Sequence, residues 1–387
     1  MSHVRARDLG IVIGEGTPGP FNAITDVAGV RVGHTTIIRG DGPLVVGQGP
    51  VRSGVTVVIP HDGDIWAEPL FAGTATLNGN GELTGLEWIR ESGMLSGPIG
   101  ITNTNDVGKV RDALVSAAAA SFDPGATHWS LPTAGETYDG QLNDIAGGHV
   151  RAEHVADAFA AARGGHVDEG NVGGGTGMIC HEFKGGIGTA SRRLPEAVGG
   201  WTVGVLVQAN YGRRGLLRID GVPVGEEIGY DVVPSPWEDE RRSVAALNRP
   251  PGAGSIIGII ATDAPLLPNQ CERLARRSHL GLARMGGVGS PTSGDLFLAF
   301  ASGNRGMPST EAEPEGDGTI EIRAFTDRAL GFLFEATVEA TEEAIVNALV
   351  AAETLTGRDG NTAYRLPHDR LVAVMRDHRR LRGAPTT

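Results

Sequence analysis

One short stretch constrains this chain more than any other: a turn-forming run that leads directly into a strongly apolar strand. Residues 250–255 read Pro-Pro-Gly-Ala-Gly-Ser, and residues 256–261 read Ile-Ile-Gly-Ile-Ile-Ala. An uninterrupted apolar run of this length, bounded by turn residues, is typical of a strand that is covered on both faces. The sequence therefore predicts that the hydroxyl of Ser255 lies at the edge of the core, where a rigid strand begins.

This position would give Ser255 a second property if the chain were cut directly before it. Breaking the Gly254–Ser255 bond would leave Ser255 with both a hydroxyl group and a free α-amine, which is the arrangement of an N-terminal nucleophile hydrolase. Gly-Ser pairs are also ordinary turn chemistry before strands, so the dipeptide by itself favours a plain turn. The functional interpretation therefore depends on the rest of the chain.

Composition and charge limit the classes of function. A net charge of −13 on 387 residues lacks the basic character that neutralises phosphates, so we expect no nucleic-acid partner. No apolar run reaches the length of a membrane span, and the first residues do not resemble a signal peptide, so we expect a soluble, cytoplasmic protein without a membrane partner. Cys180 and Cys271 offer neither a disulfide framework nor a metal cluster, and the histidines lack paired metal-binding spacing. We therefore expect no metal and no other cofactor.

The spacing of apolar residues predicts an α+β protein. Helical periodicity runs through residues 267–282 and 335–355, and residues 201–209 alternate as a strand does. Strands and helices fall into groups without the strict alternation of a doubly wound fold, which favours helices stacked outside antiparallel sheet. The remaining predicted features are strands at 54–60, 98–102, 296–300 and 320–325, a hairpin or two short strands at 22–34, and an exposed, mobile connector at 231–254.

A hydroxyl nucleophile needs a base, an orienting group and donors for the developing oxyanion. Ser293 and Asp295 lie two positions apart before an apolar strand, so in extended geometry both point to one side and could handle a proton. Asn210 ends another apolar strand and could donate its side-chain amide to an oxyanion. Each of these residues also fits an ordinary turn, so their combination matters more than any one of them.

Residues 136–145 mix polar and aromatic side chains and are predicted to form a loop. Tyr138 could donate a hydroxyl hydrogen bond there, and Glu136 could pair with an ammonium group; a solvated loop with a packed tyrosine is the alternative. The glycines of 173–177 lack the Lys-Ser/Thr pair of a phosphate-binding loop, so we interpret them as close backbone packing.

Taken together and in this order, the motifs resemble the L-aminopeptidase/D-esterase and β-aminopeptidase family of self-processing serine hydrolases. The resemblance covers nearly the whole chain, from about Asn22 to the C-terminal helix. The motifs that carry it are Asn22–Val27, Asn78–Glu82, Ile101–Thr104, Glu136–Gly140, Gly173–Gly177, Phe183–Gly186, Gln208–Asn210, Gly254–Ser255 and Ser293–Asp295.

The resemblance implies a single domain over residues 1–387, folded as a four-layer αββα sandwich like that of the N-terminal-nucleophile hydrolases. The implied strand connectivity is shared with ornithine acetyltransferase. It further implies self-cleavage between Gly254 and Ser255 into an α chain (1–254) and a β chain (255–387). The implied roles are the nucleophile for Ser255, proton transfer for Ser293 and Asp295, oxyanion stabilisation for Asn210 and Tyr138, and substrate-ammonium binding for Glu136.

The implied activity is that of an aminopeptidase with esterase or amidase activity on small peptides, amino-acid amides or esters. A homo-oligomer of cleaved protomers, namely a tetramer, is also implied. Some members have Glu where this chain has Asp295, which leaves the proton path open: the base is either the freed α-amine or the Asp295–Ser293 pair. The substrate class also stays open among L-α, D-α and β-amino acids.

Two alternatives remain at this point. One is an acyltransferase of the ornithine acetyltransferase type or an amide-oligomer hydrolase on the same fold, against which Ser rather than Thr at position 255 argues. The other is an uncleaved small-molecule binding protein.

Overall fold

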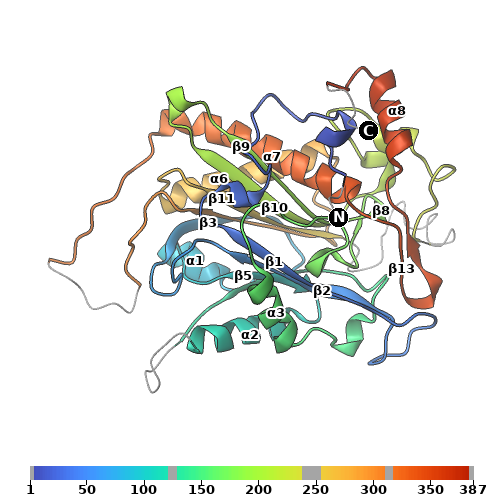
Figure 1. Ribbon diagram of the computed structural model, residues 1–387, viewed down its shortest axis with the longest axis horizontal. Helices are drawn as coiled ribbons and strands as arrows, with labels where there is room; N and C mark the ends of the chain where they lie inside the picture. The colour runs from blue at the N-terminus through green and yellow to red at the C-terminus, as the bar shows by residue number, and fades with distance from the viewer. Residues whose placement is uncertain (1–3, 121–128, 238–253, 310–316, 383–387) are drawn as a thin grey trace.

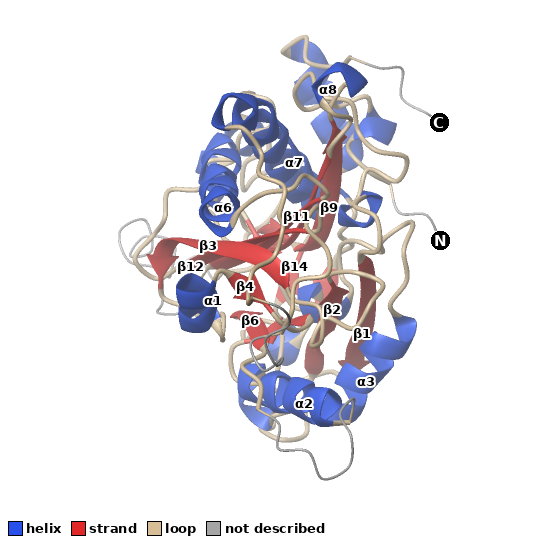
Figure 2. Cartoon of the chain, turned by 90° about the vertical axis from the view of Figure 1, so that its left-hand side faces the viewer, coloured by secondary structure: helices blue, strands red, loops and turns tan. Residues whose placement is uncertain are grey.

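Two β-sheets stack face to face in the computed structural model, and helices cover the outer face of each sheet (Figures 1 and 2). The structure describes residues 4–120, 129–237, 254–309 and 317–382. The layers follow one another as helix, sheet, sheet and helix, so the predicted α+β sandwich is confirmed. Most of the predicted connector at 231–254 lies outside the described residues.

The smaller sheet has the strand order β1-β2-β5-β6. Strand β2 runs antiparallel to both of its neighbours, β1 and β5, whereas β6 runs parallel to β5. Helices α2 and α3 pack on its outer face, where Val55, Val110 and Val155 share one apolar cluster. The bounds are β1 Arg31–Arg39, β2 Val51–Ile59, β5 Ile99–Asn103, β6 Thr133–Thr137, α2 Val107–Ala119 and α3 Ala152–Ala161.

The larger sheet has the strand order β4-β3-β12-β11-β10-β9. Its bounds are β4 Met94–Leu95, β3 Leu70–Gly79, β12 Gly294–Ala301, β11 Ser255–Thr262, β10 Thr202–Asn210 and β9 Gly186–Arg193. Strands β11 and β12 are parallel, because helix α6 (Pro268–Arg284) carries the chain back between them. Helix α2 does the same between β5 and β6, so each sheet contains one parallel pair among the antiparallel pairs that the sequence favoured.

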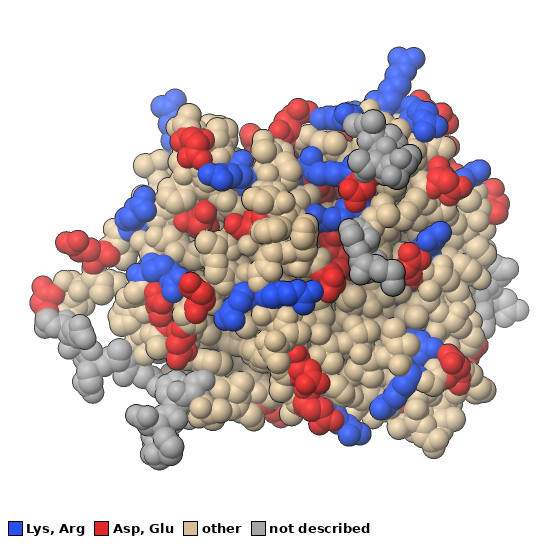
Figure 3. Space-filling view, viewed as in Figure 1, with Lys and Arg blue, Asp and Glu red and all other residues tan. Residues whose placement is uncertain are grey.

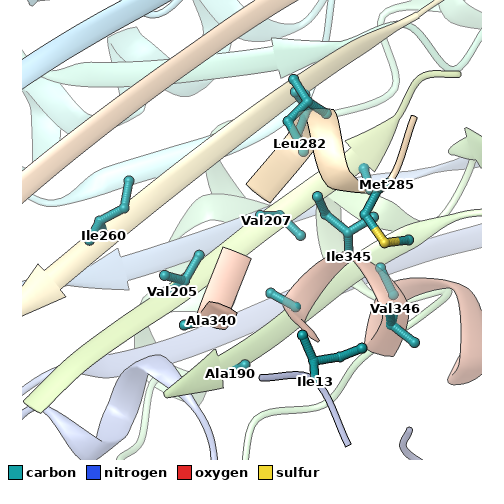
Figure 4. Close-up of a cluster of buried hydrophobic side chains, with 14 of the residues drawn as sticks. Ile13, Ala190, Val205, Val207, Ile260, Leu282, Met285, Ala340, Ile345 and Val346 are labelled. Atoms are coloured by element: carbon teal, nitrogen blue, oxygen red, sulfur yellow. The ribbon is translucent and has the colours of Figure 1, made fainter. Parts of the chain in front are cut away.

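Strand β11 is buried on both faces, as the apolar run predicted. Ile257 and Ile259 point between the two sheets, where they join Leu206 and Ile101 in one cluster. Ile256 and Ile260 point the other way, into the cluster beneath the helices. Figure 4 shows part of this second cluster, in which Val205, Val207 and Ile260 of the sheet lie near residues of α6 and of helix α7 (Leu330–Val350); these helix residues are Leu282, Ala340 and Ile345.

Helix α7 is buried along most of its length, although it carries two acidic side chains toward the sheet. Arg192 of β9 contacts both of them, with nitrogen–oxygen distances of 2.9 Å to Glu339 and 2.7 Å to Glu343. Arg7, in the N-terminal segment, also contacts Glu343 at 2.8 Å. These ion pairs join the start of the chain to the outer helix layer and satisfy the buried charges.

Two sequence predictions about local structure were wrong. Residues 320–325 form no regular strand, and Ile320 and Ile322 are half exposed, because the segment joins no sheet edge. Residues Ile24–Asp26 form a short 3-10 turn instead of a hairpin strand. The Asp26 carboxylate accepts the backbone N–H groups of Phe21 and Ala23, and this local hydrogen bonding replaces strand pairing.

The remaining elements are short or peripheral. Their bounds are α1 Leu86–Ser92, α4 Val224–Glu227, α8 His368–Asp377, β7 Ile179–Cys180, β8 Phe183–Lys184, β13 Leu355–Thr356 and β14 Thr362–Ala363. Within the described ranges, no helix is both long enough and apolar enough to cross a lipid bilayer. On the face seen in Figure 3, acidic and basic side chains are interspersed and do not gather into a patch of one sign.

Candidate active site

Strand register brings the predicted site residues together at one end of the larger sheet. Ser255, the first residue of β11, is paired with Asn210, the last residue of antiparallel β10. On its other side Ser255 is paired with Gly294, the first residue of parallel β12. Asn210 precedes Ser255 by 45 residues in the sequence (255 minus 210), and Gly294 follows it by 39 (294 minus 255). Both nevertheless lie beside this serine in the sheet.

The Ser255 hydroxyl is held between two backbone groups. Its Oγ donates to the carbonyl oxygen of Gly254 and accepts the backbone N–H of Gly294 at 3.2 Å. The residue is only 3% exposed. Gly254 has φ +134°, a conformation that side-chain-bearing residues rarely adopt, so the bond before Ser255 sits in a backbone geometry that favours glycine.

Ser293 and Asp295 face one another, as their spacing predicted. The Ser293 hydroxyl donates to Oδ1 of Asp295 at 2.6 Å. Burial raises the pKa of Asp295 to about 6, and the hydrogen bond from Ser293 offsets only part of that rise. Ser293 Oγ also lies 3.6 Å from the point that a Cβ on Gly254 would occupy. The pair therefore stands beside the Gly254–Ser255 bond.

Asn210 is held by hydrogen bonds at both ends of its side-chain amide. Its Oδ1 accepts the backbone N–H of Ile179 at 2.7 Å, and its Nδ2 donates to the carbonyl oxygen of Tyr138 at 2.8 Å. An amide nitrogen carries two protons, so one donor remains beyond the bond to Tyr138. The two contacts fix the amide plane next to Ser255.

Tyr138 contributes its backbone to this arrangement, and its ring lies folded over the following turn. A Cβ added to Gly140 would lie 2.5 Å from the Tyr138 hydroxyl oxygen, so the glycine makes room for the ring.

A small pocket opens beside the serine. Its lining consists of Tyr138, Gln141, Ile179, Asn210, Gly212, Trp237 and Gly254.

Glu136 does not lie in a loop, as the sequence had suggested, but in the buried strand β6. Its Oε1 accepts the backbone N–H of Glu82 at 2.8 Å, and its Oε2 accepts the hydroxyl of Thr104. Burial raises the pKa of Glu136 above its usual value. A Cβ added to Gly81 would lie 3.0 Å from Glu136 Oε1 and 3.0 Å from the Cα of Gly294. The carboxylate therefore lies near Gly294, the residue of β12 that pairs with Ser255.

One buried cation, for which the sequence predicted no role, lies behind the site. Lys184 Nζ donates to the carbonyl oxygens of Gly175, Met178 and Gly185, at 3.2, 2.9 and 2.8 Å. Burial lowers its pKa to about 7. These bonds hold the turn that presents the Ile179 N–H to Asn210. In the sequence, the signal for this buried cation was a single lysine among glycine and apolar residues.

The glycines of 173–177 pack as predicted, with backbone against backbone. A Cβ on Gly174 would lie 2.1 Å from Gln208 Oε1, and one on Gly175 would lie 2.4 Å from the nitrogen of Ile187. A side chain at either position would displace β9 or β10.

The backbone N–H of Gly294 was not predicted from the sequence, because every residue except proline has such a donor and the residue type does not reveal where it points.

The model of peptidase family S58 matches residues 22–363. The chain belongs to peptidase family S58. A β-peptidyl aminopeptidase, BapA from Sphingosinicella microcystinivorans, is 49% identical over 380 residues, which cover 98% of this chain and 94% of that protein. As a member of this family, the chain is a hydrolase of the aminopeptidase type.

Solved structures of two aminopeptidases resemble the chain over nearly its full length. A Burkholderia sp. β-aminopeptidase superposes with a TM-score of 0.88 at 52% identity, covering 97% of this chain and 99% of that one. An L-aminopeptidase D-Ala-esterase/amidase from Ochrobactrum anthropi, described as a variant of the Ntn hydrolase fold, gives a TM-score of 0.86 at 41% identity. That match also covers 97% of this chain and 99% of the other. The resemblance predicted from the motifs is confirmed.

Proposed function

We propose that this S58 peptidase is a self-processing aminopeptidase whose nucleophile is Ser255, acting first on its own Gly254–Ser255 bond and then on substrates. The observation that carries the proposal is the contact between the Ser255 hydroxyl and the Gly254 carbonyl group, next to the Ser293–Asp295 pair. A hydroxyl, a carboxylate and N–H donors lie close together here, and this set of groups supports acyl transfer as the reaction class.

In the self-cleavage step, Ser255 Oγ attacks the carbonyl carbon of Gly254 and gives up its proton to the Ser293–Asp295 pair. The C–N bond then breaks, the nitrogen of Ser255 takes up a proton, and Gly254 is left as an ester on Ser255 Oγ. Water hydrolyses the ester, so that Gly254 becomes a carboxylate and Ser255 keeps its hydroxyl and a free α-amine. The Gly294 N–H and the Asn210 amide are the donors suited to the oxyanion.

The substrate reaction repeats this chemistry on the amide carbonyl of an N-terminal residue. Ser255 forms the acyl-enzyme, the leaving amine takes a proton, and water releases the amino acid. Two bases are available: the new α-amine, whose unperturbed pKa is roughly 7.7–8.0, and Asp295, whose pKa burial raises to about 6. We assign Glu136 to the substrate ammonium, whose positive charge would in turn favour the ionised form of the carboxylate.

For the substrate class we propose short peptides and amides, including those that begin with a β-amino acid. The support is the 49% identity over nearly the whole chain to a β-peptidyl aminopeptidase. We further propose a homo-oligomer of cleaved protomers, namely a tetramer. The cytoplasm is our proposed location, since Cys180 and Cys271 are both buried free thiols, which suits a reducing compartment.

The test is the Ser255→Ala substitution, read by intact mass spectrometry and a denaturing gel. We expect the wild-type protein to separate into two chains and the variant to remain one chain of 40.2 kDa. Hydrolysis of amino-acid amides should fall by about 10⁴-fold or more. Ser255→Cys, which keeps a nucleophile, is the matched control and should still be cut, although slowly. A Ser255→Ala protein that is cut between residues 254 and 255 would contradict the proposal.

A further inference from the structure

The last described residues before position 238 run along the candidate site and are tied to it by hydrogen bonds. Ser235 Oγ donates to the Glu182 carboxylate at 2.8 Å. The carbonyl oxygen of Pro236 accepts from Nε2 of Gln141 at 2.8 Å. Gln141 itself lines the pocket beside Ser255. Two consecutive residues therefore anchor the segment, and Pro236 bonds directly to a residue of the pocket.

Trp237 forms part of the pocket wall. It lines the same pocket as Tyr138, Asn210 and Gly254. Its indole Nε1 is buried and has no hydrogen-bond partner within the described part of the chain. A buried N–H group that lacks an acceptor is unfavourable, so a ligand that supplies an acceptor binds more tightly. The donor and the apolar ring together point to a substrate contact.

These anchors do not depend on the bond before Ser255. Ser235 and Pro236 precede Gly254, and their partners Glu182 and Gln141 also lie in the first 254 residues. Cutting the chain after Gly254 breaks none of these contacts. Gly254, by contrast, becomes a chain end that must leave the serine before a substrate can bind. Trp237 therefore stays at the pocket when Gly254 departs.

We propose that Trp237 is a specificity-determining residue, contributed by the α chain, whose ring limits the size of the substrate acyl group and whose N–H binds a substrate carbonyl. The inference rests on the proposed function, because it assigns a selectivity to that same site. A rigid aromatic wall excludes bulk sterically, and pocket contacts of this kind change substrate discrimination by about 10–200-fold. Ser235 acts as a positioning residue, since it fixes the segment without lining the pocket.

The experiment compares cleaved wild type with Trp237→Ala, Trp237→Phe and Ser235→Ala, using amides of amino acids that differ only in side-chain size. We expect Trp237→Ala to raise the ratio of kcat/KM for the large side chain over the small one by about tenfold or more. Ser235→Ala should shift the ratio the same way, by about two- to threefold. Trp237→Phe keeps an aromatic ring, although a smaller one, and loses the donor, so kcat/KM for a dipeptide relative to the simple amide should fall about three- to tenfold.

Trp129→Ala is the matched control, because Trp129 is exposed and packs on Trp88 at a ring distance of 6.2 Å, away from the pocket lining. It should leave the ratio unchanged. An unchanged ratio in a folded, fully cleaved Trp237→Ala protein would overturn the inference, and Trp237→Phe decides the matter if the alanine variant does not fold. If the wild type itself is neither cleaved nor active on amides, the proposed function fails instead.

Discussion

Glu343 and Asp295 are two carboxylates with almost no exposed surface, at 0% and 1%, yet their surroundings differ. Glu343 contacts Arg192 at 2.7 Å and Arg7 at 2.8 Å. Asp295 accepts a hydrogen bond from the neutral hydroxyl of Ser293, and within the described ranges no arginine or lysine pairs with it. Burial alone would raise the pKa of Glu343, but the arginines outweigh it and hold that pKa below its usual value. Burial raises the pKa of Asp295 to about 6.

The difference separates a charge that holds the fold from one that can exchange a proton. Glu343 stays ionised near neutral pH and joins α7, β9 and the N-terminal segment. Asp295 titrates within reach of neutral pH and lies next to Ser255, the proposed nucleophile. Carboxylates with a raised pKa and few compensating charges are common where proton transfer is needed, because full compensation would make them inert.

The largest effect is expected from Asp295→Asn, which keeps the shape of the side chain and removes its basicity. If Asp295 accepts the proton of Ser255, self-cleavage should slow and kcat should fall by about 10²–10⁴-fold. A denaturing gel sampled over time measures self-cleavage, and the rate of amide hydrolysis gives kcat. Asp263→Asn is the matched control: Asp263 follows the opposite end of β11, and burial raises its pKa as well. Equal losses in the two variants would remove the special role of Asp295.

Breaking the ion pairs of Glu343 should lower the stability of the fold. Arg192→Met leaves the buried Glu343 charge less compensated, and we expect the free energy of unfolding to fall by about 3–5 kcal/mol. The neighbouring Arg193→Met is the control, since Arg193 is 53% exposed and pairs with Glu196 at the surface. Its loss should cost less than about 1 kcal/mol. Urea unfolding in the uncleaved Ser255→Ala background measures both, and similar losses would contradict the distinction.

The pH dependence of kcat/KM sharpens the comparison. A carboxylate acts as a base only when ionised, so activity should rise with pH through about 6, the raised pKa of Asp295. Below that pH Asp295 is protonated and the proton acceptor is lost. Should the ascending limb lie instead at roughly 7.7–8.0, the freed α-amine would be the base.

The smallest effect is expected from Asp295→Glu, which keeps the acid and moves it by one methylene. We expect kcat to fall by about tenfold, far less than in Asp295→Asn, because misplacing a reacting group costs less than removing it. Steady-state hydrolysis with both variants in parallel gives the ratio. A glutamate variant as poor as the asparagine one would show that position matters as much as charge.

The sequence alone predicted much of this protein. The apolar run after Ser255 predicted a strand covered on both faces, because continuous apolarity leaves no face for water. The two-residue spacing of Ser293 and Asp295 predicted that they face one another, because side chains alternate along a strand. The ordered motifs predicted the family. All of these are local signals, written in residue type and spacing.

Only the tertiary structure decided how distant segments meet. The register of β10, β11 and β12 places Asn210 and the Gly294 N–H on either side of Ser255. Glu136 proved to lie in a buried strand, because pairing with β5 outweighed its polar character. The docking of Trp237 left no periodic pattern to detect. Such contacts depend on packing between segments far apart in the chain, and residue spacing cannot encode them.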